Sequence, residues 1–211
     1  MIAVVDYGMG NLRSVKQALC KVAPDTEIIV TDDAQLIAKA NRVVFPGQGA
    51  MPDCMRELDA RGLRNAVLEA ARSKPFLGIC IGLQMLFEHS AEGDVAGLGL
   101  FRGDVVRFVS PLKDALGNKL KVPHMGWNQV KHVMPTHPLW NGIEQDARFY
   151  FVHSYYVRPQ DENVIQATCE YPQSFVCAIA QDNLFAVQFH PEKSAMAGLK
   201  LLQNFINWNP L

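Results

Sequence analysis

One cysteine of this chain has the surroundings of a nucleophile rather than of a packing residue. Residues 76–88 read FLGICIGLQMLFE, and Cys80 stands between Gly78 and Gly82, where an apolar run changes into a helical pattern. A G-x-C-x-G stretch has the form of a nucleophile elbow, a tight strand-to-helix turn whose crowding is relieved by glycine on either side. An isolated cysteine is most often a small buried hydrophobe. That interpretation is kept for the cysteines without flanking glycines: Cys20, Cys54, Cys169 and Cys177.

The expected position of Cys80 also suits acyl transfer. At the start of a helix, the partial positive charge and the free N–H groups favour a thiolate over a thiol. The N–H of Ile81, the next residue, is expected to point at a developing oxyanion. Cys80 is therefore the candidate nucleophile.

A thiolate nucleophile needs an imidazole base and a group that orients this base, and His190 is the best placed of the six histidines. It ends an apolar run and is followed by Pro191, which stops a central strand, and by Glu192. In an extended segment residues i and i+2 point to the same side, so His190 and Glu192 can pair. The alternative is a solvated strand end. His89 and His132 are predicted at the surface.

A second glycine cluster, PGQGA at residues 46–50, follows another apolar run. Open parallel sheets bind ligands outside the carboxyl ends of their strands, so Gly47, Gln48 and Gly49 could bring backbone N–H groups to a bound carbonyl. An ordinary turn is the alternative. A phosphate site is less well supported, because the sequence here completes neither G-x-G-x-x-G nor a P-loop.

The elements that position these residues alternate in the first third of the chain. Strands are predicted at 2–8, 26–30, 42–47 and 75–79, and helices at 11–23, 34–40 and 63–73. This alternation is typical of parallel strands joined by crossover helices. The strands are apolar on both faces, which indicates a sheet covered by helices on both sides.

Strands joined by short turns predominate after a helix that is expected to begin near Cys80. They are predicted at 97–109, 119–133, 147–159, 164–171, 175–181 and 183–191, with a hairpin turn within 180–184 and a final helix at 196–208. No repeat or linker is visible, so a single domain over residues 1–211 is predicted. The expected fold is a three-layer α/β fold: a mostly parallel central sheet flanked by helices, with additional antiparallel strands in the C-terminal half.

The composition of the chain limits which partners, cellular locations and metal or disulfide sites are expected. With 211 residues, 49% of them hydrophobic, the chain is long enough to bury one sizeable core. A net charge of −1 predicts no attraction to nucleic acid or to an anionic membrane. No apolar run is long enough for a membrane span, and the start of the chain does not have the form of a signal peptide. Five cysteines without a C-x-x-C pair predict neither disulfides nor a zinc site, so we expect a cytoplasmic protein without a metal or another cofactor.

The order P-G-x-G, then G-x-C-x-G-x-Q, then H-P-E resembles the class I (triad) glutamine amidotransferase domain over essentially the whole chain. Four stretches, DYGMGNL at 6–12, PHMGWN at 123–128, YFVHSYY at 150–156 and HPEKS at 190–194, are similar to the glutaminase subunits of imidazole glycerol phosphate synthases. The resemblance implies hydrolysis of L-glutamine and transfer of the ammonia to a (βα)₈ barrel cyclase subunit in histidine biosynthesis. The partner would make the complex a heterodimer.

The resemblance also implies roles for individual residues. Cys80 would be the nucleophile, His190 the general base and then acid, and Glu192 the carboxylate that orients it. The glutamine would be bound by the residues Gly47, Gln48, Gly49, Ile81, Gln84, Ser154 and Tyr155. Without the resemblance, Gln84 would be a surface amide of a helix and Tyr155 a strand aromatic. Gln48 departs from the pattern, because a small apolar residue is more common at this position.

The partner should bind around the opening of the site, since free ammonia is protonated in water and loses its nucleophilicity. The candidate interface residues are Asn11, Trp127 and Lys193, with Trp127 chosen because large aromatic side chains anchor interfaces. The alternative for Trp127 is a core tryptophan of a second sheet. Two other functions stay open from the sequence: a stand-alone cysteine hydrolase or peptidase of the same fold, and a catalytically silent module that binds a partner.

Overall fold

The computed structural model describes residues 1–109, 111–113 and 116–210. Residues 110, 114, 115 and 211, which the predicted domain includes, lie outside this description. The helices of the described part are α1 (Leu12–Val22), α2 (Ala34–Lys39), α3 (Met51–Ala60), α4 (Arg64–Ser73), α5 (Ile81–Gln84) and α6 (Ala195–Asn207). Three 3-10 turns are η1 (Pro138–Trp140), η2 (Glu162–Val164) and η3 (Pro191–Lys193).

A large mixed sheet forms the centre of the molecule. Its parallel part has the strand order β2-β1-β3-β4-β16, with β1 (Ile2–Val5), β2 (Ile28–Thr31), β3 (Arg42–Gly47), β4 (Phe76–Cys80) and β16 (Leu184–Val187). The sheet continues, mostly antiparallel, through β15 (Ser174–Gln181), β13 (Tyr155–Pro159), β7 (Phe101–Arg107), β5 (Phe87–Ser90) and β6 (Val95–Ala96). A branch from β15 adds β14 (Ile165–Glu170) and β11 (Lys131–His132). Two separate pairs are β10 (His124–Gln129) with β12 (Arg148–His153) and β8 (Leu112–Lys113) with β9 (Lys119–Leu120).

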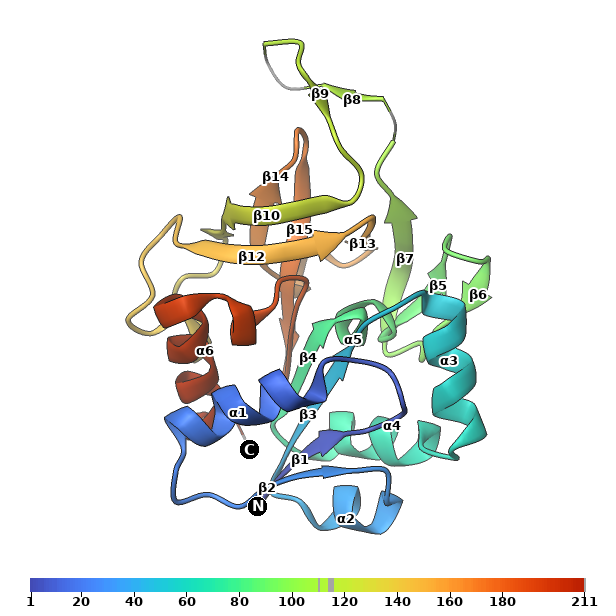
Figure 1. Cartoon of the computed structure of the whole chain (residues 1–211), viewed down its shortest axis with the longest axis vertical. Coiled ribbons are helices and arrows are strands. Elements are labelled where there is room, and N and C mark those ends of the chain that lie inside the picture. Colours follow the sequence, from blue (N-terminus) through green and yellow to red (C-terminus); the bar gives the residue numbers. More distant parts are fainter. Residues whose placement is uncertain (110, 114–115, 211) are drawn as a thin grey trace.

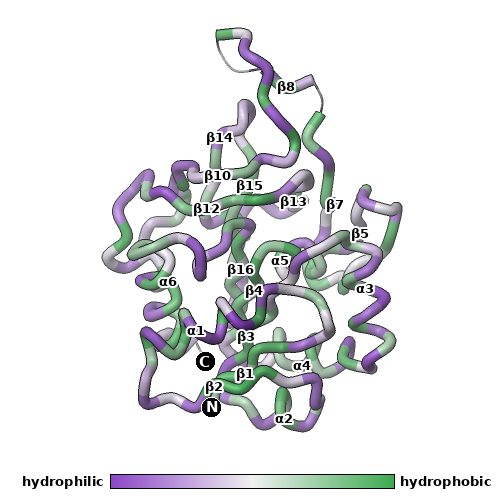
Figure 2. The backbone as a smooth tube through the Cα atoms, in the orientation of Figure 1, coloured by the Kyte–Doolittle hydropathy of each residue, from purple (hydrophilic) through white to green (hydrophobic). Residues whose placement is uncertain are grey.

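Helices cover the parallel part of the sheet as predicted. α1 packs with α6 and α2 packs with α4, and the two pairs lie on either side of the strands (Figure 1). The parallel strands are among the most hydrophobic stretches of the backbone (Figure 2), and every residue of β1, β4 and β16 is buried. The three-layer α/β prediction is confirmed. Among the described residues, no helix has both the length and the apolar character that crossing a bilayer requires.

Local sequence explains where the first helix begins and which face it buries. The side chain of Asn11 caps α1 by accepting a hydrogen bond from Ser14 N–H. Val15, Ala18 and Leu19 are buried, so one apolar stripe of the helix faces the core. The predicted helix at residues 11–23 is therefore confirmed within one residue at either end.

Two helices differ from the prediction. The sequence predicted no helix at residues 51–60, where the structure has α3; Pro52 in its first turn was a start signal, because proline is favoured there. The helix expected after Cys80 is a single turn, α5, and the chain then enters β5. Residues 81–87 are buried without a break, so this stretch has no burial period that distinguishes a helix from a strand.

Two predicted strands are divided between sheets. Residues 147–159 form β12 in the small sheet and β13 in the large one, with a bend at Ser154, whose carbonyl accepts a hydrogen bond from Phe108 N–H at 3.1 Å. Residues 119–133 are divided in the same way into β9, β10 and β11. The hairpin within 180–184 is confirmed, since Gln181 pairs with Leu184 across a two-residue turn.

Candidate active site

Three neighbouring strands of the parallel sheet bring the predicted site residues to one edge. In the register of β3 and β4, Gly47 lies directly beside Cys80. In the register of β16 and β4, Val187 lies beside Ile79, so the chain beyond β16 passes Cys80 and reaches His190 three residues later. The carboxyl ends of these strands meet at the same edge, as expected for an open α/β sheet.

Cys80 has the strained backbone of a nucleophile elbow. Its φ is 56° and its ψ is −111°, a conformation that residues with a side chain rarely adopt. A Cβ at Gly82 would collide with the carbonyl oxygen of Phe45, and one at Gly78 would lie 2.9 Å from Cβ of Ala186. The two glycines therefore allow the turn to pack between β3 and β16.

His190 and Glu192 form a buried hydrogen-bonded pair, with 2.8 Å between His190 Nδ1 and Glu192 Oε1. The pair forms across the 3-10 turn η3 and not along an extended segment, so the predicted contact arises from a different local geometry. Ser194 Oγ donates to the His190 carbonyl, and His190 N–H donates to the Tyr150 carbonyl at 2.9 Å. These bonds hold the backbone of the turn and leave His190 Nε2 as the nitrogen available for chemistry.

The charges around His190 favour its protonated form. Burial lowers the pKa of His190, but the negative charges of Cys80 and Glu192 outweigh burial and raise this pKa to about 10. His190 Nε2 has no hydrogen-bond partner in the described part of the chain. An imidazolium beside a thiolate is the arrangement that a cysteine nucleophile and its general acid require.

Cys80 and His190 both line a cavity of about 230 Å³. The predicted binding residues Gln48, Gly49, Ile81, Gln84, Ser154 and Tyr155 also line it, whereas Gly47 is buried in β3 beside the nucleophile. Four lining residues were not predicted from the sequence: Glu92, Pro123, Val152 and His153. Glu92 belongs to the β5–β6 turn, Val152 and His153 belong to β12, and Pro123 directly precedes β10. Only the tertiary structure brings these two regions to the cavity.

Gln84 is a buried residue of the cavity wall and not a surface amide. It is 1% exposed, and its Nε2 donates to the Tyr155 carbonyl at 3.1 Å and to Gln188 Oε1 at 3.0 Å. Gln188 Nε2 is in turn 3.7 Å from Cys80 Sγ. The sequence analysis also missed Gln188, although the alternation of a strand places it on the same side as His190.

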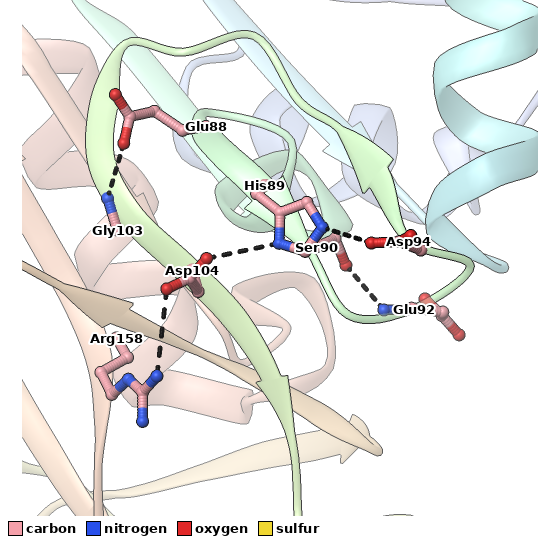
Figure 3. Close-up of polar contacts among 8 residues, drawn as sticks. All are labelled: Glu88, His89, Ser90, Glu92, Asp94, Gly103, Asp104 and Arg158. Atoms are coloured by element: carbon pink, nitrogen blue, oxygen red, sulfur yellow. Dashed lines mark hydrogen bonds and ion pairs between the residues drawn. The ribbon is translucent and has the colours of Figure 1, made fainter.

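Glu92 reaches the cavity from the turn between β5 and β6. Figure 3 shows the contacts that hold this turn: Glu92 N–H donates to Ser90 Oγ at 3.1 Å, and His89 bridges Asp94 at 2.9 Å and Asp104 at 3.3 Å. Glu92 Oε2 accepts a hydrogen bond from Met51 N–H at the start of α3. Among the described residues that line the cavity, Glu92 is the one carboxylate.

The predicted surface position of His132 is wrong. His132 is 6% exposed and stacks on Trp140 with 4.2 Å between the ring centroids. His89 is half-exposed, in agreement with its prediction. In the described part of the chain, no group of three or more His, Cys, Asp or Glu side chains is placed to hold a metal ion.

Trp127 and Lys193 lie on one surface with Tyr150 between them. The rings of Trp127 and Tyr150 are 6.2 Å apart in an edge-to-face arrangement, and Lys193 Nζ is 5.9 Å from the centre of the Tyr150 ring. Trp127 is 48% exposed, so it is not a core tryptophan, and Met125 on the same side of β10 is 61% exposed. Asn11 caps α1, the helix that contacts η3, in which Lys193 lies.

A glutamine analogue with an electrophilic diazo-ketone is expected to modify Cys80 on the order of 100-fold faster than any other cysteine, because we expect the cavity to hold the analogue beside Cys80 Sγ. Burial raises the pKa of Cys54 to about 11 and that of Cys169 to about 12, and it also raises the pKa of Cys177 well above its usual range, so these thiols stay protonated. Mass spectrometry of the digested protein locates the adduct. Iodoacetamide, which has no side chain to fit the cavity, is the control and should modify exposed Cys20. Labelling by the analogue chiefly at Cys20 or Cys177 would contradict the assignment of Cys80.

A match to a family model agrees with the fold. Residues 3–208 match the family "Glutamine amidotransferase class-I". The structure is also similar to a crystal structure of glutamine amidotransferase, with a TM-score of 0.72 and 18% identity over 98% of both chains. A second similar structure is the glutaminase domain of Trypanosoma brucei CTPS with bound acivicin, with a TM-score of 0.63 and 18% identity over 99% of this chain and 94% of that one. The chain belongs to the class-I glutamine amidotransferase family.

Relatives with a much higher sequence identity indicate which members of the family this chain resembles closely. The imidazole glycerol phosphate synthase subunit HisH of Thiobacillus denitrificans is 63% identical over 99% of this chain and 92% of its own length. The HisH subunit of Nitrosospira multiformis is also 63% identical, over 100% of this chain and 99% of its own. The similarity to the glutaminase subunits that the sequence motifs indicated is thereby confirmed.

Proposed function

We propose that the chain hydrolyses L-glutamine to glutamate and ammonia at Cys80, with His190 and Glu192 completing the triad. The observation that carries this proposal is the meeting of the strained Cys80 and the buried His190–Glu192 pair at one cavity. The further proposal is that the ammonia passes to a (βα)₈ barrel cyclase subunit, which makes imidazole glycerol phosphate and AICAR. The names of the relatives support a synthase partner.

The first half of the reaction forms a thioester. Cys80 gives its proton to His190 Nε2, and the thiolate attacks the side-chain amide carbon of glutamine. Backbone N–H groups of Ile81 and of the Gly47–Gln48 loop would hold the oxyanion, and each such donor contributes about 3 to 4 kcal/mol of transition-state stabilisation. The C–N bond then breaks, and His190 gives its proton to the leaving nitrogen, so that ammonia departs.

The second half releases glutamate. His190, now neutral, takes a proton from a water molecule that attacks the thioester carbon. The C–S bond breaks, and Cys80 leaves as the thiolate that the imidazolium stabilises. Glu192 accepts the Nδ1–H of His190 throughout and keeps Nε2 directed at the reacting atoms.

We propose that the surface of Met125, Trp127, Tyr150 and Lys193 binds the cyclase subunit. Trp127 is exposed, and Tyr150 and Lys193 beside it are half-buried. Aromatic side chains next to a cation are typical of the residues that dominate binding at interfaces. The five cysteines are unpaired, and this supports a reducing compartment, so the cytoplasm is the proposed location.

The experiment that tests the function is glutamate release from glutamine, measured for the chain alone and with a barrel cyclase that holds its nucleotide ligand. Release that depends on the cyclase supports the proposal. Peptide cleavage without glutamine hydrolysis would favour the stand-alone peptidase, and no activity with an intact complex would favour the silent binding module.

Replacing Glu92 with glutamine is expected to raise the KM for glutamine by about 10- to 100-fold, with a smaller effect on kcat. We propose that the Glu92 carboxylate binds the α-ammonium group of the substrate, and charge-assisted hydrogen bonds contribute about 1.5 to 3 kcal/mol. The amide oxygen of the variant can still accept from Met51 N–H, so the start of α3 is preserved. Steady-state kinetics of glutamate release measure the effect.

The matched control is Glu88→Gln, because Glu88 lies on β5, accepts a hydrogen bond from Gly103 N–H (Figure 3) and does not line the cavity. Its KM should stay near that of the unchanged protein. An unchanged KM in Glu92→Gln would remove Glu92 from the binding site and leave the triad proposal intact.

A further inference from the structure

Two histidines outside the proposed triad link strand β10 to the wall of the cavity. His124 and His153 face each other across β10 and β12, and 3.0 Å separate His124 Nδ1 from His153 Nε2. His153 Nδ1 is 2.8 Å from the Tyr155 carbonyl oxygen, and Asn128 Nδ2 is 3.2 Å from His124 Nε2. The side chains therefore form a continuous hydrogen-bonded chain from Asn128 to Tyr155, which we call the histidine bridge.

The direction of every hydrogen bond in the histidine bridge is determined. Burial lowers the pKa of His153 to about 3, although the hydrogen bond to the Tyr155 carbonyl acts in the opposite direction, and burial lowers the pKa of His124 to about 4. Near pH 7 each ring is neutral and carries one N–H. The Tyr155 carbonyl can only accept, so His153 donates from Nδ1 and accepts at Nε2. His124 then donates from Nδ1 and accepts from Asn128.

The Tyr155 carbonyl is also the end of a second chain that comes from the nucleophile. It accepts from Gln84 Nε2, Gln84 donates to Gln188, and Gln188 Nε2 lies 3.7 Å from Cys80 Sγ. One carbonyl oxygen thus uses both of its lone pairs, one for the histidine bridge and one for the cavity wall. A displacement of His153 would move the acceptor on which the position of Gln84 depends.

Aromatic packing holds both rings of the histidine bridge in place. His124 stacks on Tyr171 and Phe151, with centroid distances of 4.0 and 4.9 Å. His153 lies 5.1 Å from the Phe175 ring, and its side chain is buried in the same cluster. Because the interior is close-packed, the rings transmit a shift of one strand to the next instead of absorbing it.

We propose that His124 and His153 are positioning residues of the glutamine site. They hold the Tyr155 carbonyl and the Gln84 side chain at fixed positions relative to strand β10. The proposal rests on the proposed function, because it concerns the same cavity. His124 is 3% exposed and faces inward, whereas Met125 and Trp127 face outward on the proposed cyclase surface. A partner that moves β10 therefore moves the histidine bridge, and with it the wall that binds glutamine.

Replacing His153 with phenylalanine tests the histidine bridge. Phenylalanine keeps a ring in the aromatic cluster but lacks both nitrogens, so one buried hydrogen bond to the Tyr155 carbonyl is lost. In the complex with the cyclase, the KM for glutamine is expected to rise about tenfold, with a smaller change in kcat and no change in the ammonia-dependent reaction. His153→Gln, whose amide can both donate and accept, should recover part of this loss.

The matched control is His132→Phe, the same substitution at another buried histidine, which lies in β11 outside the cavity. It is expected to leave KM unchanged, so a general effect of removing a buried imidazole would be recognised. Thermal unfolding establishes that each variant is folded. If His153→Phe does not fold, Asn128→Ala at the half-exposed end of the histidine bridge carries the same test, with an expected rise in KM of about threefold.

A double-mutant cycle with Gln84→Ala then decides whether His153 acts through Gln84. If it does, His153→Phe should add less than about twofold to KM once Gln84 is absent. Additive effects, or an unchanged KM in folded His153→Phe, would overturn the positioning role. A failure of the proposed function would look different, because the unchanged complex would then show no glutamine-dependent synthesis.

Discussion

Replacing Cys80 with alanine is expected to reduce glutamine-dependent synthesis in the complex by at least about 10⁴-fold, because no thioester can form. Synthesis from added ammonia should be unchanged, since the cyclase would use ammonia from any source. Parallel assays of the complex with glutamine and with an ammonium salt at high pH measure the two reactions. The contrast between them separates a chemical defect from a failure of the two subunits to assemble.

The other triad variants should follow an order that the geometry sets. His190→Ala removes the base and is expected to approach the loss in Cys80→Ala. Glu192→Gln should lose less, because an amide oxygen can still accept from His190 Nδ1 and only the charge is lost. Cys20→Ala, a substitution at an exposed cysteine on α1, is the matched control and should leave both reactions unchanged. An equal loss of the ammonia-dependent reaction in Cys80→Ala would contradict a division of labour between two chains.

Adding the liganded cyclase is expected to raise glutamine turnover by at least about 100-fold over that of the chain alone. One oxyanion donor changes kcat by about 10² to 10³, and we infer that the Gly47–Gln48 peptide supplies this donor only in the complex. A Cβ on Gly10 would lie 3.6 Å from Gly47 Cα and 3.8 Å from Gln48 N. Contacts that reach Asn11, the next residue, can therefore act directly on this peptide.

Variants of the proposed interface should weaken the stimulation without changing the triad. Trp127→Ala and Lys193→Ala are expected to reduce the stimulated rate about tenfold at a fixed, subsaturating cyclase concentration, as the loss of about 1.4 kcal/mol in binding predicts. Lys39→Ala, an exposed lysine at the end of α2, is the control. If the isolated chain hydrolyses glutamine as fast as the liganded complex, the inference that the Gly47–Gln48 peptide supplies its donor only in the complex is wrong, although the assignment of Cys80 would survive.

The chemistry of the site was largely visible in the sequence, because it depends on local constraints. A turn as tight as the one at Cys80 requires small residues on either side. Gly78 and Gly82 meet this requirement, so the turn can be recognised within five residues of sequence. His190 and Glu192 are two residues apart, so they can meet in more than one backbone geometry. The extended geometry assumed from the sequence was wrong, yet the contact formed in the turn η3.

The parallel core was predictable for a similar reason. Strands buried on both faces are apolar throughout, and the helices between them have a 3.6-residue period, so each element is identified by its own residues. The pattern was insufficient where an element is very short or changes sheet. The single turn of α5 and the bend at Ser154 leave no period of their own in the sequence.

By itself, the sequence determined the G-x-C-x-G turn at Cys80 and the two-residue spacing of His190 and Glu192, because neighbours along the chain make these features. From them it predicted Cys80 as the nucleophile and His190 as its base. Only the tertiary structure decided that Glu92, Gln188 and His153 belong to the same cavity, and that Trp127 and Lys193 share a surface. The physical reason is that these residues come from strands and turns far apart in the chain, which no local pattern relates. Their relative positions depend on the bend between β12 in the small sheet and β13 in the large sheet. The packing of the whole core determines this bend.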